Sequence, residues 1–130
     1  MAEQVERERT LEATPAEVWD AITDERLLSE WLADEAELDP EPGGAVRFRL
    51  GDEERTGRIE RLEVGRSLAF TWSRDGEGPS LVELTLEPAV SGTRLVVVER
   101  ALSGPLASGT AHRWQGALGE LANALQLVPA

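Results

Sequence analysis

The sequence predicts an α+β fold in which a curved antiparallel sheet of about seven strands wraps around a long C-terminal helix. The chain shows, in order, one strand-like segment, two short helical segments, a series of short segments with a period of two, and one long amphipathic helix. Because three helices would cover a flat sheet of this size only partly, the sheet is expected to curve around the last helix. A length of 130 residues fits one domain covering residues 1–130.

The N-terminal part predicts one strand followed by two short helices. Residues 3–13 have the weak alternation of a first strand. The run Thr14-Pro15-Ala16-Glu17 combines a capping residue, a proline in the first turn and a glutamate that completes a capping box, so a helix is expected over 15–22. Asp24 supplies a second cap, and a second helix is expected over 25–32.

From residue 33 onward the apolar period changes to two, and Gly, Pro and Asp-Gly pairs separate the segments. This pattern predicts antiparallel strands over residues 34–40, 46–50, 55–64, 68–73, 82–87 and 93–102. Ile59 and Leu62 are out of phase within one strand, which predicts a β-bulge between them. The alternation in the other strands indicates that one face of the sheet is buried.

The C-terminal segment has the strongest helical periodicity in the chain. Its apolar residues recur at steps of four, three, four and three: Trp114, Leu118, Leu121, Leu125 and Val128. Gly116 and Gly119 each lower the helix propensity by roughly 1 kcal/mol relative to Ala. We expect these two glycines to allow a close approach between the helix and its neighbours.

Composition excludes several kinds of chemistry. The chain has no Cys, Tyr or Lys and a single His, which excludes disulfides, thiolate catalysis, cysteine zinc sites, Schiff-base lysines and Walker-type phosphate loops. A net charge of −12, concentrated in residues 1–65, argues against nucleic acid as a partner. No apolar run approaches the ~18 residues of a membrane span, and the N-terminus lacks the apolar core of a signal peptide. We therefore expect a cytoplasmic protein without membrane insertion, cofactor or metal.

Several segments, taken in their order and spacing, resemble the SRPBCC superfamily. They are Ala13-Thr-Pro-Ala-Glu-Val-Trp-Asp-Ala-Ile22, Ile22-Thr-Asp-Glu-Arg-Leu-Leu-Ser-Glu-Trp31, Gly43-Gly44, Leu68-Ala-Phe-Thr-Trp72, Ser91-Gly-Thr-Arg-Leu95, and Trp114 with Leu118, Leu121 and Leu125. This superfamily includes the START lipid-transfer domains and the birch-pollen-allergen-like proteins, which share the helix-grip fold. Within it, the sequence is most similar to the AHSA branch, named after an activator of a heat-shock protein's ATPase.

The chain departs from that branch at the start of the last helix. The branch often has a His three residues before a Gly-Trp pair, whereas Thr110 and Arg113-Trp114 stand in those places here. His112 is therefore not carried over as the family histidine. It is either a polar group at the mouth of a cavity or a capped surface residue.

The resemblance implies a cavity between the concave face of the sheet and the C-terminal helix, which would bind a small hydrophobic or aromatic ligand. The pleat of the strands and the period of the helix place these apolar residues along it: Phe48, Leu50, Phe70, Trp72, Leu84, Leu86, Leu95, Val97, Trp114, Leu118 and Leu121. Trp31, from the second short helix, would close one end of the cavity. The alternative is that the same residues simply fill a core.

Glu99 is the polar candidate for this cavity, because the family register turns it inward after Leu95 and Val97. A buried carboxylate needs a partner or must take up a proton. Glu99 would therefore orient a polar group of the ligand or act as a base. The alternative is that it pairs with an Arg or reaches solvent at the strand end.

An acidic series precedes the first Gly-rich turn: Asp34, Glu35, Glu37, Asp39 and Glu41. Calcium is disfavoured, because Pro40 and Pro42 interrupt the series and the spacing of an EF-hand loop is absent. A solvated strand edge is expected instead, where charges discourage pairing with another sheet.

Three functions stay open at this stage. The preferred one is a binding module for a small hydrophobic ligand. For such a module, the resemblance also implies lipid binding and a role in the stress response. The second is a polyketide cyclase-like enzyme that uses Glu99 or another carboxylate of the cavity as a proton shuttle, although the missing Tyr, the single His and the lack of any catalytic signature disfavour it. The third is a co-chaperone-like interaction module, so the predicted partners include a second copy of the chain or another protein.

Overall fold

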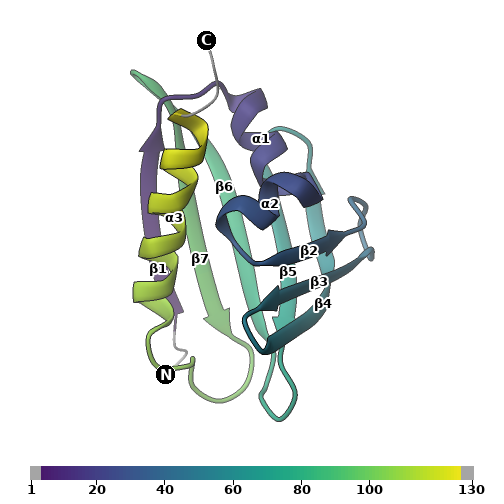
Figure 1. Ribbon diagram of the computed structural model, residues 1–130. Coiled ribbons are helices and arrows are strands. Elements are labelled where there is room, and N and C mark those ends of the chain that lie inside the picture. Colours follow the sequence, from purple (N-terminus) through teal and green to yellow (C-terminus); the bar gives the residue numbers. More distant parts are fainter. Residues whose placement is uncertain (1–3, 127–130) are drawn as a thin grey trace.

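The computed structural model describes residues 4–126, and its order of elements is the predicted one (Figure 1). The elements are β1 (Gln4–Leu11), α1 (Pro15–Thr23), α2 (Glu25–Trp31), β2 (Glu35–Leu38), β3 (Ala45–Leu50), β4 (Glu53–Glu63), β5 (Ser67–Ser73), β6 (Ser80–Ala89), β7 (Gly92–Ala101) and α3 (Thr110–Gln126). The predicted positions Glu3 and Val128 lie outside the described residues. None of the helices between residues 4 and 126 is both long and apolar enough to cross a membrane.

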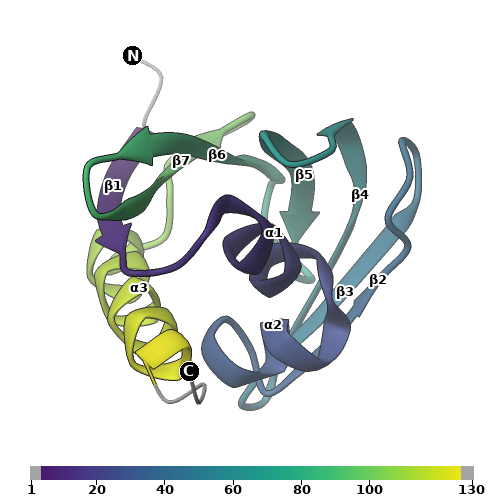
Figure 2. The same cartoon turned by 90° about the horizontal axis from the view of Figure 1, so that it is seen from above.

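The strands form one antiparallel sheet in the order β1-β7-β6-β5-β4-β3-β2. The first strand pairs with the last, and every other neighbour in the sheet is also its neighbour along the chain. Short turns suffice for these connections, because consecutive antiparallel strands need no crossover. Figure 2 shows the sheet curling around the molecule while the three helices close its open side. This arrangement confirms the predicted helix-grip fold.

Side-chain caps define the two short helices as the sequence predicts. Thr14 Oγ1 accepts a hydrogen bond from the Glu17 amide at 3.1 Å, and Glu17 Oε1 accepts one from the Thr14 amide at 2.9 Å. Asp24 Oδ1 accepts hydrogen bonds from the amides of Arg26 and Leu27. The caps satisfy backbone donors that a helix start would otherwise leave unpaired.

The predicted β-bulge in β4 is confirmed by a register shift against β5 between Ile59 and Arg61. Close beside it, Gly57 pairs with Trp72. A Cβ atom on Gly57 would lie 1.7 Å from the carbonyl oxygen of Thr71, so no larger residue fits there without movement of the backbone. A bulge bends its strand locally, and a glycine allows two strands to approach closely, so both features favour a curved sheet.

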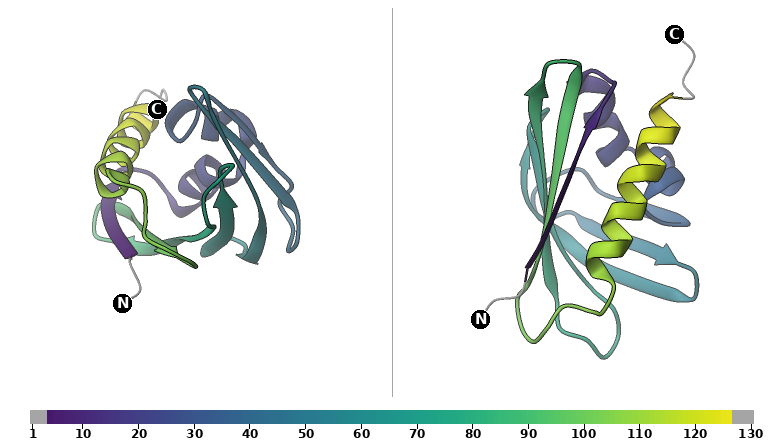
Figure 3. Two further views of the ribbon diagram at one scale, coloured as in Figure 1. Left: turned by 90° about the horizontal axis from the view of Figure 1, so that it is seen from below. Right: turned by 90° about the vertical axis from the view of Figure 1, so that its left-hand side faces the viewer.

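The helix α3 lies across the concave face and buries its apolar stripe against the sheet (Figure 3). From it, Trp114, Leu118 and Leu121 join a continuous core of inward-facing strand residues. The expectation about the helix glycines is wrong: a Cβ atom added to Gly116 or Gly119 would meet no atom within 4 Å, so neither glycine makes a close approach to a neighbour. The apolar stripe of α3 therefore packs through its large side chains.

Candidate functional site

Glu99 faces inward from β7 and is 2% exposed, which confirms its predicted orientation. Its Oε1 accepts a hydrogen bond from the indole Nε1 of Trp114 on α3 at 2.8 Å. Its Oε2 accepts hydrogen bonds from the Nε1 of Trp72 on β5 at 2.9 Å and from the Oγ of Ser80 on β6 at 2.5 Å. One carboxylate thus joins three strands and the C-terminal helix.

The donors around Glu99 suit a carboxylate. Indole N–H groups can donate but not accept, so Trp72 and Trp114 each need an acceptor when buried. The two rings also stack on one another, with centroids 5.9 Å apart and an interplanar angle of 25°. Within residues 4–126, Glu99 forms no ion pair, and its side chain is buried away from solvent, so neither alternative considered for it applies. Neutral donors compensate for its burial instead.

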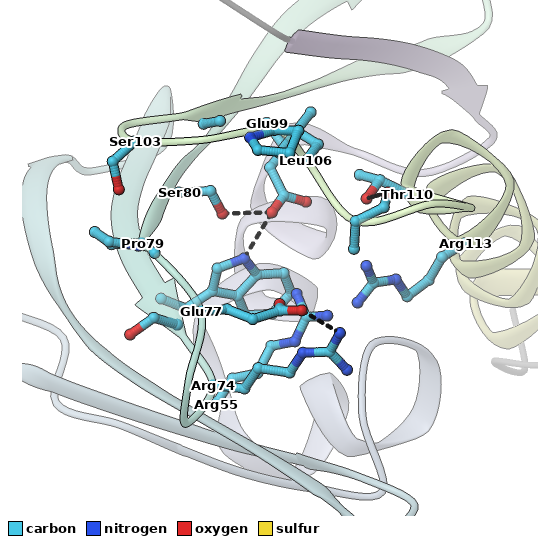
Figure 4. A pocket seen from close by; sticks show the side chains of 16 residues that line it. Arg55, Arg74, Glu77, Pro79, Ser80, Glu99, Ser103, Leu106, Thr110 and Arg113 are labelled. Atoms are coloured by element: carbon cyan, nitrogen blue, oxygen red, sulfur yellow. Dashed lines mark hydrogen bonds and ion pairs between the residues drawn. The ribbon is translucent and has the colours of Figure 1, made fainter.

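A cavity of about 210 Å³ opens beside this carboxylate, and we call it the Glu99 cavity (Figure 4). It lies at the end of the sheet where the β5–β6 turn, the β7–α3 loop and the first turn of α3 come together, at the lower end of the molecule in Figure 1. Its lining comprises Arg55, Trp72, Ser73, Arg74, Glu77, Gly78, Pro79, Ser80, Glu99, Ala101, Ser103, Pro105, Leu106, Ala107, Thr110 and Arg113.

Two of the three arginines in the lining are paired with carboxylates. Arg55 is 6% exposed, its Nη2 lies 3.0 Å from Glu53 Oε1, and its Cζ lies 4.6 Å from the centroid of the Trp72 ring. Arg74 places Nη1 2.9 Å from the same Glu53 oxygen and Nη2 2.5 Å from Glu77 Oε1. The hydrogen bond to Glu77 and the charge of Glu53 raise the pKa of Arg74, and the hydrogen bond from Arg74 lowers the pKa of Glu77.

The third arginine, Arg113, comes from the first turn of α3 and is half-buried. Its guanidinium points across the cavity toward Arg55 and Arg74 (Figure 4). Among residues 4–126, no side-chain hydrogen bond or ion pair engages it. Burial lowers the pKa of Arg113, and the nearby charge of Arg55 lowers it further.

Comparison with known proteins identifies the family to which the chain belongs. The sequence model of the family described as "Activator of Hsp90 ATPase homolog 1-like protein" matches residues 12–126. The chain belongs to this family, AHSA1. The match confirms the resemblance to the AHSA branch that the sequence motifs indicate. No match was found among the curated proteins.

Solved structures share the AHSA1 fold of this chain. A protein from Mesorhizobium loti is 22% identical with a TM-score of 0.87, and the alignment covers 98% of this chain and 100% of that one. DynU16, a protein in the dynemicin biosynthetic locus, is 26% identical with a TM-score of 0.85; 95% of this chain aligns, but it spans about half of DynU16, 47%. The Aha1 dimer from Colwellia psychrerythraea is 17% identical with a TM-score of 0.80, covering 98% and 99% of the two chains.

The structure separates the predicted site residues of this AHSA1 protein into groups. Trp72 and Glu99 line the Glu99 cavity. Trp31 and Leu121 line a second, apolar groove of about 170 Å³ between the three helices. Leu86 lines a third hollow of about 530 Å³, and Leu118 lines a fourth of about 360 Å³.

The remaining predicted residues lie in or against the core. Leu50 is half-buried and packs against it. The others are buried members of the core cluster: Phe48, Phe70, Leu84, Leu95, Val97 and Trp114. Phe48 and Phe70 contact each other and Trp72 with ring centroids 5.5 Å apart, so aromatic rings fill the middle of the concave face.

Sequence reasoning missed the arginines of the cavity. A signal was present for Arg55, because it alternates with Gly57 and Ile59 and so shares their inward face. A weaker signal was present for Arg113, which stands beside Trp114 where the AHSA branch often has Gly. Arg74 follows the end of β5, and its place in the cavity depends on the conformation of the following turn.

The other two polar candidates lie away from the cavity. His112 is exposed on α3 and is absent from the cavity lining. The acidic series lies on and around the edge strand β2, where Glu35 and Glu37 form exposed ion pairs with Arg49 and Arg47 of β3. These contacts agree with the prediction of a solvated strand edge.

Proposed function

We propose that this AHSA1 protein binds a small organic molecule with a hydrophobic or aromatic part in the Glu99 cavity. The observation that carries the proposal is a preformed hollow in which apolar side chains and converging polar groups share one lining. Its apolar residues are Trp72, Pro79, Ala101, Pro105, Leu106 and Ala107. Such a combination gives affinity through desolvated apolar surface and orientation through the polar groups.

The volume limits the size of the ligand. Sites for drug-sized ligands occupy about 300–1,000 Å³, and this cavity has about 210 Å³. The proposed ligand is therefore a small molecule with one or two rings. Trp72 is already engaged by Arg55 and Trp114, so the hydrophobic part of the ligand would contact mainly the proline and leucine side chains of the two loops.

The hydrogen bonds of Glu99 support binding rather than acid–base catalysis by this residue. Both of its oxygens accept hydrogen bonds from protein donors. To act as a base toward a substrate, the carboxylate would take up a proton on one of these oxygens, which weakens the hydrogen bonds that the oxygen accepts from a buried indole or from Ser80. A polyketide cyclase-like reaction through Glu99 is therefore the less favoured alternative.

Two of the similar solved structures bear on this proposal. The place of DynU16 in a biosynthetic locus agrees with a small organic molecule as the ligand. The dimer formed by the Colwellia psychrerythraea protein keeps a homodimer among the predictions for this chain. A co-chaperone-like partner, lipid binding and a stress-related role stay predictions of the sequence resemblance.

Native mass spectrometry tests the proposal. The mass of the gently purified protein, compared with its denatured mass, reveals a small molecule that is released on unfolding. We expect a discrete added mass in the wild type and in Ala89→Leu, which enlarges a half-buried residue at the far end of β6. Ala101→Leu, which fills the cavity, should abolish it. No added mass, together with no binding of apolar fluorescent probes, would contradict the proposal.

A further inference from the structure

Besides Glu99 itself, the charged side chains that line the Glu99 cavity, which we call its rim, are Arg55, Arg74, Glu77 and Arg113. They are not all paired with an opposite charge. Glu53 contacts both Arg55 and Arg74, and Glu77 contacts Arg74. Two carboxylates are thus shared by two guanidiniums, and neither is in contact with Arg113. The arginine from α3 is the rim cation that lacks a contacting partner within the described part of the chain.

Glu99 does not take the place of that partner. Its charge favours the charged form of Arg113, but its hydrogen-bonding capacity is directed to two indoles and a hydroxyl. Arg113 carries five N–H donors in a planar fork. Half-burial removes part of their hydration, so an acceptor supplied from the cavity would compensate for it.

Resting on the function proposed above, we infer that the ligand of the Glu99 cavity carries a carboxylate group and that Arg113 determines this specificity by pairing with it. The hydrophobic part of the ligand would then lie against Pro79, Pro105 and Leu106, which line the same cavity. Arg113 is a binding residue in this proposal and has no chemical step to perform.

A planar, singly charged group fits this rim better than a phosphate. A carboxylate matches the guanidinium fork with two parallel hydrogen bonds. A doubly charged phosphate would place more negative charge near Glu77 and Glu99, which also line the cavity. The lowered pKa of Arg113, caused by burial and by Arg55, agrees with a cation whose compensation is incomplete without a ligand.

A pair of matched probes tests the inference. 2-Naphthoate and 2-naphthamide have nearly the same shape, but only naphthoate carries a charge and two accepting oxygens. The ratio of their dissociation constants therefore reports on recognition of the carboxylate. Titration calorimetry is carried out on the wild type, on Arg113→Gln, and on Arg26→Gln, which removes the same charge from an exposed position on α2. Thermal unfolding by circular dichroism confirms that each variant is folded. Arg113→Lys is a second variant that keeps the charge without the planar fork.

We expect the wild type and Arg26→Gln to bind naphthoate about tenfold or more tightly than naphthamide, as one charge-assisted contact supplies. Arg113→Gln should bind both probes alike, and Arg113→Lys should keep part of the preference. Equal binding of both probes by the wild type would overturn the inference but leave the proposed function standing. A preference for naphthoate that survives in Arg113→Gln would have the same meaning. If neither probe binds the wild type, the result counts against the inference and against the proposed function.

Discussion

Trp114 Nε1 lies 2.8 Å from Glu99 Oε1, and this hydrogen bond fastens the C-terminal helix to the last strand of the sheet. The opposite oxygen of the same carboxylate holds Trp72 and Ser80. Glu99, which the sequence indicates as a candidate base, therefore holds the wall of the cavity together through these hydrogen bonds.

Replacing Glu99 by Gln should destabilise the protein. A carboxamide has one accepting oxygen, and in either orientation its NH₂ group would face an indole N–H, that of Trp114 or that of Trp72. A buried donor therefore loses its acceptor, at a cost of about 1–3 kcal/mol. Urea unfolding measures the change. Glu120→Gln, an exposed position on α3, is the control and should leave the free energy of unfolding unchanged. Equal stability of Glu99→Gln and the wild type would contradict this role of the carboxylate.

Replacing Trp114 by Phe should cost more than the same change at Trp19. Both substitutions remove an indole N–H, but the Trp114 group is buried and bonded to Glu99, whereas Trp19 is half-buried on α1 without a side-chain hydrogen bond to a described residue. We expect an additional loss of about 1–3 kcal/mol at Trp114 from the unpaired carboxylate oxygen. Chemical denaturation of both variants gives the comparison, and a smaller loss at Trp114 would disprove it.

Two glycines should respond to Ala in opposite directions. At Gly57 the new Cβ would meet the Thr71 carbonyl, so we expect a loss of at least about 2 kcal/mol from overpacking. At Gly116 the new Cβ would meet open space on an exposed helix position, so we expect a gain of about 0.5–1 kcal/mol from helix propensity. Thermal unfolding of both variants tests this, and a tolerated Gly57→Ala would refute the close strand approach.

The capping box should be visible in the titration of Glu17. Its hydrogen bonds with the backbone and hydroxyl of Thr14 lower the pKa of this carboxyl below the ordinary value of 4.5. Because the folded-state pKa is lowered, the contribution to stability is present above pH 4.5 and is lost as the pH falls through the lowered pKa. Carboxyl-resolved NMR titration should show the pKa of Glu17 rising toward 4.5 in Thr14→Ala; an unchanged pKa would argue against the box.

Local patterns explain why so much of the fold could be predicted. The cap at Thr14, the bulge after Ile59 and the inward register of Glu99 depend on residues close together in the chain. Periods of two and 3.6 identify which side chains face inward. These periods do not show whether an inward side chain packs into the core or lines a cavity. In this structure Phe48 and Phe70 pack into the core.

The cavity depends on contacts that local patterns do not contain. Arg55 belongs to β4, Arg74 directly follows β5, and Arg113 belongs to α3. These residues line one cavity only because the curved sheet brings the strand ends to the first turn of the helix. Arg55 meets Glu53 within β4 itself, whereas the contact between Arg74 and Glu77 depends on the turn between β5 and β6. The position of the cavity at the end of the sheet follows from that packing.

The four tryptophans of the chain provide the most direct test of ligand binding in the Glu99 cavity. Their indole N–H signals can be followed by two-dimensional ¹H–¹⁵N NMR while 2-naphthoate is added. Trp72 lines the cavity, Trp31 lines the groove between the helices, and Trp19 lines neither. We predict that the Trp72 signal moves with saturable behaviour while those of Trp19 and Trp31 stay in place. Movement of the Trp31 signal instead, or of none of the four, would contradict the account.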